Sequence, residues 1–205
     1  MRIKTVRSFE KNHKIPRIIW DQIFHNIPYT PSSFGLKPWK FFIIENKNYK
    51  NKLKKAFISE NNIQQLENSS AIVLILGDQD KKKLANYIYQ QKFLNQEFNQ
   101  ETKDQLLKKI NQHYDDMNIL NLKNELYLEA GIVATHFMIE AQSLGYNGCF
   151  IGGCYYNQLN NILNIPERYL PIILFSLGKE NKNLETKKQK KNILKLDINH
   201  FFNFL

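Results

Sequence analysis

The sequence predicts a mixed α/β domain, and three observations carry that prediction. Apolar runs of strand length stand at 39–45, 71–78 and 171–178, and segments with helical spacing lie between them. No repeat or linker interrupts the 205 residues, a length that fits one domain. With 42% hydrophobic and 13% aromatic residues, the chain can bury a core, which excludes a disordered protein. We therefore expect a single domain over residues 1–205.

The first half of the chain predicts two helices and two strands. A helix over 15–27 is expected because its isoleucines and Phe24 recur at helical spacing, and Pro28 ends it. The loop that follows contains two prolines and Gly35, and it leads into a buried strand at 39–45. A lysine-rich helix at about 48–58 comes next. The run AIVLILGD at 71–78 then predicts a second buried strand. The expected inner face of the first helix is Ile15, Ile18, Ile19, Ile23 and Phe24.

The second half predicts a polar helical stretch, a long helix and a closing strand. Residues 81–118 are polar and helical, and five aromatic residues are their expected anchors. The clearest helix covers 122–143, where apolar residues keep helical spacing up to a Leu-Gly stop. A short strand at 147–153 runs into a glycine turn, a helix follows at about 156–164, and a third buried strand covers 171–178. The five expected anchors are Tyr87, Tyr89, Phe93, Phe98 and Tyr114.

Charge and cysteine content narrow the classes of protein. The chain has 29 Lys+Arg against 19 Asp+Glu, a net charge of +10, but only four of the basic residues are arginines. Surfaces that bind nucleic acid favour the bidentate guanidinium, so a nucleic-acid partner is disfavoured and stays only as a rival interpretation. Cys149 and Cys154 are too few for a disulfide framework or a zinc site, and we expect reduced packing residues. No signal core or membrane-length apolar run is present, so the expected location is the cytoplasm, with no membrane partner.

Three loops next to expected strands offer groups that could hold a ligand. The N-terminal cations and hydroxyl of residues 2–7 suit an anion, although a solvated terminus would also explain them. The rigid string PSSFGLKPW at 31–39 carries two hydroxyls and a glycine, and an ordinary connection explains only part of it. The paired glycines after Ile151 allow a planar group to approach the backbone, but they also fit a simple tight turn.

Together, these strings resemble the FMN-dependent nitroreductase family. SSFGLKPWKF resembles its signature loop, TVRSF its basic opening, and NNIQQLENSSAIVLIL its Asn/Gln flavin-contact segment. LYLEAGIVATHFMIEAQSLGYNGCFIGG resembles its core helix and glycine turn, and IPERYLPIILFSLG its closing strand. The resemblance implies an α+β, three-layer fold with a central, mainly antiparallel sheet flanked by helices, assembled as an intertwined homodimer. It also implies FMN at the subunit interface, reduced by NADH or NADPH, with electrons passing to a nitroaromatic, quinone or related acceptor in a ping-pong cycle.

The resemblance also implies particular cofactor contacts. Lys4 or Arg2, together with Thr5, would hold the phosphate, and Arg7 would face the pyrimidine edge of the flavin. Ser32, Ser33 and Gly35 would reach FMN from the partner subunit, while Asn62 and Gln65 would face its polar edge. Ile151, Gly152 and Gly153 would approach the flavin N5 atom, and Lys188 with Lys190 would close the phosphate site. Because FMN itself carries the chemistry, no catalytic side chain and no metal site are expected.

Two segments and the reaction itself leave alternatives open. Residues 81–118 would form a variable helical lid in which Tyr114 is either a gate over the substrate or an anchor of the helix pair. Residues 179–205 would form a C-terminal extension that embraces the partner subunit. The same fold and FMN could instead serve dihydropteridine reduction, reductive dehalogenation or flavin destruction.

Overall fold

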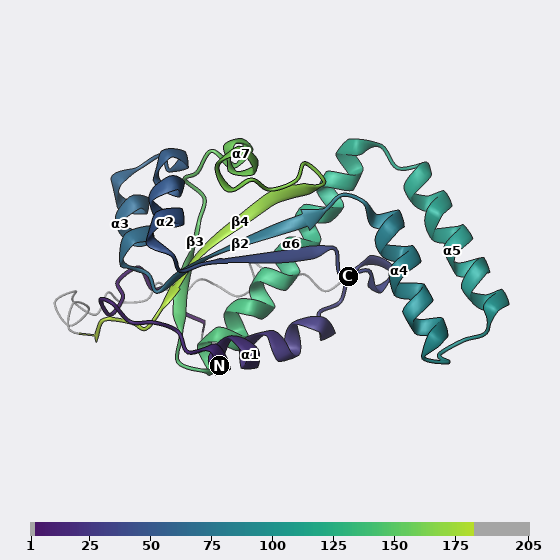
Figure 1. Cartoon of the computed structure of the whole chain (residues 1–205), viewed down its shortest axis with the longest axis horizontal. Helices are drawn as coiled ribbons and strands as arrows, with labels where there is room; N and C mark the ends of the chain where they lie inside the picture. Colours follow the sequence, from purple (N-terminus) through teal and green to yellow (C-terminus); the bar gives the residue numbers. More distant parts are fainter. Residues whose placement is uncertain (1–2, 183–205) are drawn as a thin grey trace, which may run out of the picture.

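The computed structural model describes residues 3–182, and its centre is an antiparallel sheet (Figure 1). Within that range, four strands lie in the order β1-β2-β4-β3, and every neighbouring pair is antiparallel. Their bounds are β1 (Trp39–Ile44), β2 (Ala71–Asp78), β3 (Asn147–Ile151) and β4 (Tyr169–Gly178). The expected mainly antiparallel sheet is confirmed.

Helices cover both faces of this sheet. Successive side chains of β2 point to opposite faces, and each face has its own hydrophobic cluster. Ala71, Val73 and Ile75 pack with α1 (Arg17–Asn26) and α6 (Ile119–Ser143). Ile72, Leu74 and Leu76 pack on the opposite face with three further helices, α2 (Lys47–Leu53), α3 (Glu60–Asn68) and α7 (Leu159–Leu163). The structure therefore has three layers, as the resemblance implies.

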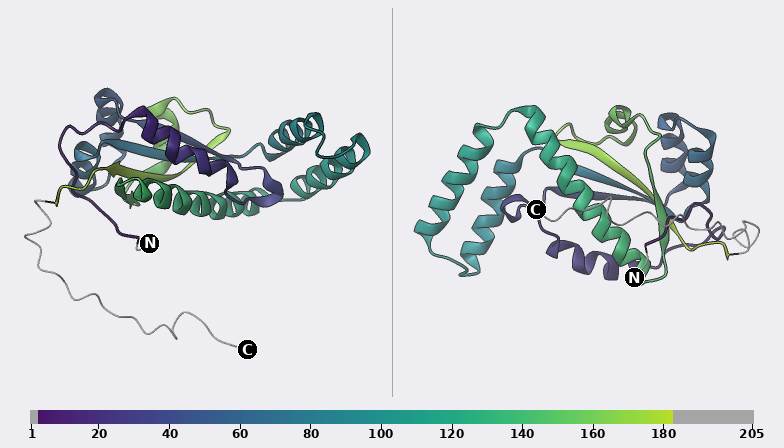
Figure 2. Two further views of the ribbon diagram at one scale, coloured as in Figure 1. Left: turned by 90° about the horizontal axis from the view of Figure 1, so that it is seen from below. Right: turned by 180° about the vertical axis from the view of Figure 1, so that it is seen from behind.

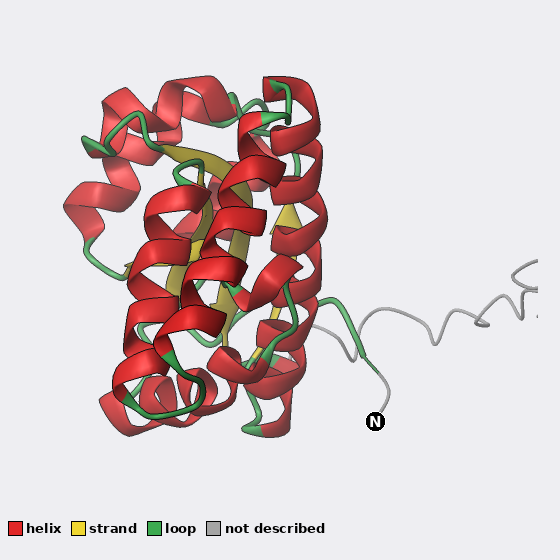
Figure 3. Cartoon of the chain, turned by 90° about the vertical axis from the view of Figure 1, so that its right-hand side faces the viewer, coloured by secondary structure: helices red, strands yellow, loops and turns green. Residues whose placement is uncertain are grey.

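A pair of helices extends beyond one end of the sheet. These helices are α4 (Lys81–Leu94) and α5 (Gln100–Asp115), and the views from below and from behind show them projecting from the layered body (Figure 2). Seen from that end, helices stand in front of the sheet (Figure 3). Leu36, Ala85, Tyr89 and Ile110 form a separate small core there. The stretch is helical, as the sequence predicts, but Tyr87 is 65% exposed and is not one of its anchors.

Three sequence predictions need correction. The strand at 39–45 was expected to be buried, yet β1 is an edge strand in which only Ile44 is fully buried. Ile18 was expected on the inner face of the first helix, but it is 62% exposed, and Trp20 is buried instead. The long helix begins at Ile119 rather than at 122, because the side chain of Asn118 caps it by accepting from Asn121 N at 2.9 Å.

The other edge of the sheet is β3, and the N-terminal segment runs along it. Thr5 forms a parallel bridge with Gly148, and Val6 N donates to Gly148 O at 2.9 Å. Further along, Phe9 bridges Glu180 just after β4. The first residues are thus fixed beside the strand that leads into the glycine turn. Among the described residues, no helix is both long and apolar enough to cross a bilayer.

Candidate functional site

The glycine turn after β3 is built by contacts with the segment that leads into α3. Gly153 O accepts from the side-chain amide of Asn62 at 3.2 Å and from Ile58 N at 3.1 Å. A Cβ atom on Gly153 would stand 2.2 Å from Asn62 Nδ2, whereas a Cβ on Gly152 would meet nothing within 4 Å. The close contact with Asn62 therefore needs glycine at 153, and the turn is open at 152. The structure brings together Asn62 and the predicted turn.

Gln65 lies one helical turn beyond Asn62 on α3, and it is not a solvated residue. Its side chain is only 5% exposed, and its Nε2 atom has no hydrogen-bond partner among the described residues. A buried donor without a partner costs about 1–3 kcal/mol, so such a group is well suited to a ligand that supplies an acceptor. Contact between Gln65 and the polar edge of a flavin stays a prediction.

Ile151 contributes less to the turn than its neighbours do. Its side chain lies in the core, and its carbonyl accepts from the Tyr156 hydroxyl at 2.7 Å. Burial raises the pKa of Tyr156 to about 12, so the phenol stays protonated and keeps donating. The structure thus gives Ile151 the role of holding the end of β3.

The N-terminal residues bring cationic and hydroxyl groups to the β3 edge of the sheet. Thr5 and Arg7 are exposed beside β3, and no carboxylate of the described chain pairs with Arg7. The ammonium of Lys4 pairs with the buried carboxylate of Glu180, so part of its charge is already neutralised. Arg7 is therefore the free cation of this group within residues 3–182. Arg2, Lys188 and Lys190 lie outside the described residues.

The loop Ser32–Lys37 lies elsewhere, against α4 (Figure 1). The Tyr89 hydroxyl donates to Phe34 O at 3.3 Å, and Ser32 Oγ accepts from Lys37 N at 2.8 Å. The loop lies at the end of β2 that leads into α4, whereas the glycine turn contacts α3, which leads into the other end of β2. One chain therefore does not bring Ser32, Ser33 or Gly35 to Asn62 and Gly153.

Contacts with Glu125 and Phe34 fix the side chain of Tyr114. Its hydroxyl donates to Glu125 Oε1 at 2.9 Å, and its ring meets that of Phe34 edge-on at 5.9 Å. Burial and the hydrogen bond to Glu125 raise the pKa of Tyr114, so the hydroxyl remains a donor. These contacts are those of an anchor; a gating role remains a prediction.

Sequence reasoning missed a charged cluster beside this loop, which consists of the buried Lys81 and Glu129 and the half-buried Glu125. One signal was available, since Glu129 falls at helical spacing within the apolar stripe of Leu126, Ala130 and Val133. A carboxylate on a core-facing stripe requires a partner, and Lys81 is that partner.

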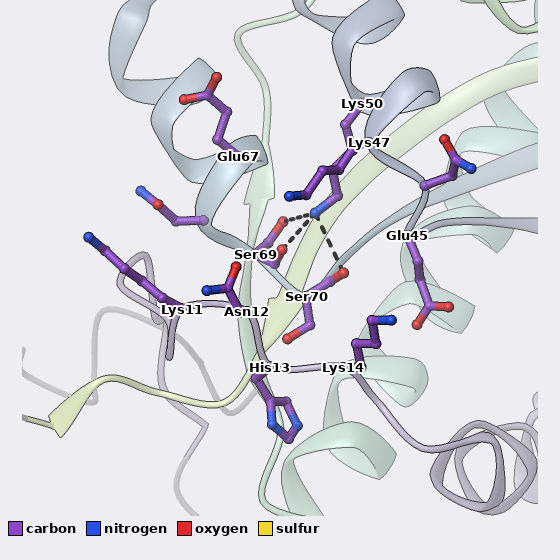
Figure 4. A pocket seen from close by; sticks show the side chains of 12 residues that line it. Lys11, Asn12, His13, Lys14, Glu45, Lys47, Lys50, Glu67, Ser69 and Ser70 are labelled. Carbon is purple, nitrogen blue, oxygen red and sulfur yellow. Dashed lines mark hydrogen bonds between the residues drawn. The ribbon is translucent and has the colours of Figure 1, made fainter.

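The structure also has a cavity of about 740 Å³ that is lined by residues 11–14, 45–47, 50 and 67–70 (Figure 4). The buried ammonium of Lys50 donates to Ser69 O at 2.6 Å, at the carboxyl end of α3. Burial lowers the pKa of Lys50 to about 8, although Glu45 opposes that shift. Lys50 thus caps the helix, and the described site residues predicted from sequence do not line this cavity. Residues 3–182 contain no cluster of His, Cys, Asp or Glu able to hold a metal ion.

Comparison with known proteins places these features in a family. The model of the Nitroreductase family matches residues 3–179. The Bacillus subtilis protein named "Putative NAD(P)H nitroreductase YodC" is 28% identical over 178 residues, which cover 87% of this chain and 86% of that protein. A Staphylococcus epidermidis structure described as a "putative NAD(P)H:FMN oxidoreductase" has a TM-score of 0.89 at 28% identity, covering 99% of this chain and 92% of that one.

A third similar protein was solved with a flavin. The Exiguobacterium sibiricum structure described as a "putative nitroreductase in complex with FMN" has a TM-score of 0.86 at 26% identity, covering 99% of this chain and 93% of that chain. The family match spans most of the sequence, and the structural likeness extends over all three layers. The chain belongs to the nitroreductase family and is an oxidoreductase of that family.

Proposed function

We propose that this protein is an FMN-dependent oxidoreductase that takes electrons from NADH or NADPH and reduces nitroaromatics, quinones or related acceptors. The observation that carries the proposal is the open glycine turn in contact with the Asn62 amide, with the orphaned Gln65 amide one helical turn further along α3. These groups can hold the polar edge of a flavin ring, and a similar protein has been solved in complex with FMN. When bound, FMN would supply the hydride chemistry.

Each residue near the turn has a task in this proposal. Arg7 places a permanent positive charge near the pyrimidine edge, where a reduced flavin gathers negative charge. The Thr5 hydroxyl and Lys4 hold the phosphate, with Lys188 and Lys190 adding charge from the C-terminal segment. Gly152 leaves room for a planar ring to approach the backbone.

We further propose a homodimer with two shared sites. Ser32, Ser33 and Gly35 belong to one end of the sheet and the glycine turn to the other, so a second chain is needed to bring the two groups together. The C-terminal segment 179–205 would embrace the partner subunit. Each site would then combine the turn of one protomer with the loop of its partner.

The absorption spectrum of the purified protein tests the cofactor. We expect a visible flavin band, present as isolated or after mixing with FMN, that bleaches when NADH or NADPH is added under argon. Colourless protein that gains no band with FMN would contradict the proposal. Arg7→Met should weaken FMN binding, whereas the control Arg17→Met should not, because Arg17 pairs with Asp21 on the exposed surface of α1.

The acceptor is a separate question, and one comparison favours a second candidate. A Lactiplantibacillus plantarum protein named "CLA biosynthesis enone reductase" is 25% identical over 176 residues, covering 85% of this chain and 81% of that protein. An activated carbon–carbon double bond is therefore an alternative acceptor to a nitro group or quinone. A steady-state comparison of a nitroaromatic, a quinone and a conjugated enone, each with NADH and with NADPH, separates these reactions. Dihydropteridine, haloaromatic and flavin substrates extend the same screen.

A further inference from the structure

A buried cluster of charges lies beneath the loop Ser32–Lys37. Lys81 is the first residue of α4, and it is only 1% exposed. Its ammonium pairs with Glu129 Oε2 at 2.5 Å and also with Glu125. Glu129 itself is 2% exposed. Charges buried to this degree are retained only where their partners compensate for the loss of water.

The cluster connects the loop to three helices. Glu129 Oε1, the oxygen that does not face Lys81, accepts from Ser33 N at 2.9 Å. Glu125 accepts from Tyr114 at the end of α5. Although burial alone raises the pKa of Glu125, the hydrogen bond and charge of Lys81 lower it, with help from Tyr114 and Ser33. The start of α4, the end of α5 and the middle of α6 therefore meet at one loop.

The loop needs such support because its backbone is strained. Phe34 and Lys37 have φ values of 52° and 49°, in the left-handed region that residues with a Cβ atom seldom occupy. Conformations of this kind persist only where the surroundings fix them. The hydrogen bond from Ser33 to Glu129 lies directly before the first strained residue. It anchors the loop at the point where the unusual geometry begins.

We propose that Lys81 and Glu129 are positioning residues that hold the loop Ser32–Lys37 in the shape that receives the flavin. This inference rests on the proposed FMN site, because Ser32, Ser33 and Gly35 matter as ligand groups only if that site exists. The ion pair orients the Glu129 carboxylate, and the carboxylate in turn fixes the Ser33 amide. The helix pair α4–α5 is thereby coupled to the cofactor loop.

Two variants and one control separate positioning from simple stabilisation. Lys81→Met/Glu129→Met removes both charges and the acceptor, and apolar replacement of a buried pair is often tolerated by the fold. Glu129→Gln keeps the shape and one oxygen for Ser33 N, but it loses the ion pair. Lys82→Met is the control, because Lys82 is the next residue of α4 and its pair with Asp115 is exposed.

Amide hydrogen exchange of the peptide that covers residues 32–37, measured on flavin-free protein, is the first readout, and the dissociation constant for FMN is the second. In the double variant we expect exchange to be faster and FMN binding weaker, each by about tenfold, as for the loss of one charge-assisted hydrogen bond. Glu129→Gln should show a smaller change in the same direction. Lys82→Met should stay within about twofold of the wild type.

Unchanged exchange and unchanged FMN affinity in the double variant would overturn the inference. If that variant does not fold, as judged by circular dichroism, Glu129→Gln decides by the same two measurements, and wild-type values would again overturn it. If the wild-type protein binds no FMN, the proposed function fails. The exchange result on flavin-free protein then still reports whether the cluster holds the loop.

Discussion

The side-chain amide of Asn62 donates to the carbonyl oxygen of Gly153 at 3.2 Å, although the two residues are 91 positions apart in the sequence. Gly152 O is also occupied, since it accepts from Cys154 N at 2.9 Å. Both carbonyls of the turn are therefore used within the chain. What the turn can offer a ligand is its donors and its open space at Gly152.

Alanine at Gly153 tests the contact between the turn and Asn62. In Gly153→Ala the new methyl group would collide with the Asn62 amide, which must leave its carbonyl. We expect FMN binding to weaken by about tenfold, the effect of one displaced polar contact. Gly131→Ala is the control, because its methyl group would also meet nothing within 4 Å and Gly131 lies on α6, outside the turn. Fluorescence titration with FMN measures both, and equal affinities would contradict the assigned role of Asn62.

A second pair of glycines tests the fold itself. A Cβ on Gly148 would lie 1.9 Å from Ser176 O, a backbone atom of β4 that cannot move without separating the strands. We expect Gly148→Ala to lower the free energy of unfolding by about 3 kcal/mol or more. Gly131→Ala on α6 meets nothing within 4 Å and should instead raise it by up to about 1 kcal/mol. Urea unfolding measures both changes. If Gly148→Ala lowers the free energy of unfolding only slightly, β3 and β4 lie further apart than they do in this structure.

The buried Lys50 predicts a pH-dependent stability. Its pKa of about 8 in the folded state lies below the ordinary 10.5, so between these values the unfolded chain binds more protons than the folded chain. The Lys50 contribution to the free energy of unfolding should therefore rise with pH across this window, by a total on the order of 3 kcal/mol. The free energy of unfolding of the wild type, minus that of Lys50→Met, should therefore increase from pH 8 to pH 10. Lys47→Met is the control for removal of a lysine from the same cavity, because Lys47 lines it from an exposed position.

The two cysteines should be unreactive in the native protein. Cys149 and Cys154 are buried and unpaired, and burial raises the pKa of Cys154 to about 11. Because the thiolate is the reactive form, we expect both thiols to react with a chromogenic disulfide reagent only after unfolding in urea. Rapid labelling without urea would mean that the end of β3 opens in solution.

Mixed dimers test the proposed division of each site between two chains. Gly35 has a φ of 67°, which a β-branched residue does not tolerate, so Gly35→Val should distort the loop while leaving the turn intact. Co-expression with Gly153→Ala would give hybrid dimers in which one site has both defects and the other has neither. We expect these hybrids to bind one FMN tightly per dimer. Hybrid dimers that bind FMN no more tightly than either single variant would argue against a shared site.

A strand of this fold could be predicted from the sequence where both of its faces are buried. The run at 71–76 is apolar throughout because β2 lies between two helical layers, so it can be recognised without an alternating pattern. The apolar run at 39–45 has a similar composition, but β1 forms an edge of the sheet. Sequence alone does not reveal which strand lacks a second neighbour, because that depends on pairing between distant segments.

The candidate site could be predicted in composition but not in arrangement. Resemblance pointed to Asn62 and Gly153, and the structure brings them into contact. The burial of Gln65 is invisible in a polar helix sequence, since it depends on how α3 packs. Lys81 and Glu129 are 48 residues apart, so their pairing follows from the packing of α4 on α6 rather than from any local pattern.

The N-terminal segment has a consequence for solubility as well as for binding. By bridging Gly148, Thr5 covers backbone groups of β3 that would otherwise be free to pair with another chain. Removal of the first residues, or a rigid fusion that pulls them away from β3, would therefore expose unpaired backbone groups at this sheet edge and favour aggregation. A truncated protein that precipitates would have lost a protective strand neighbour together with its phosphate-binding groups, and precipitation alone would say nothing about the cofactor.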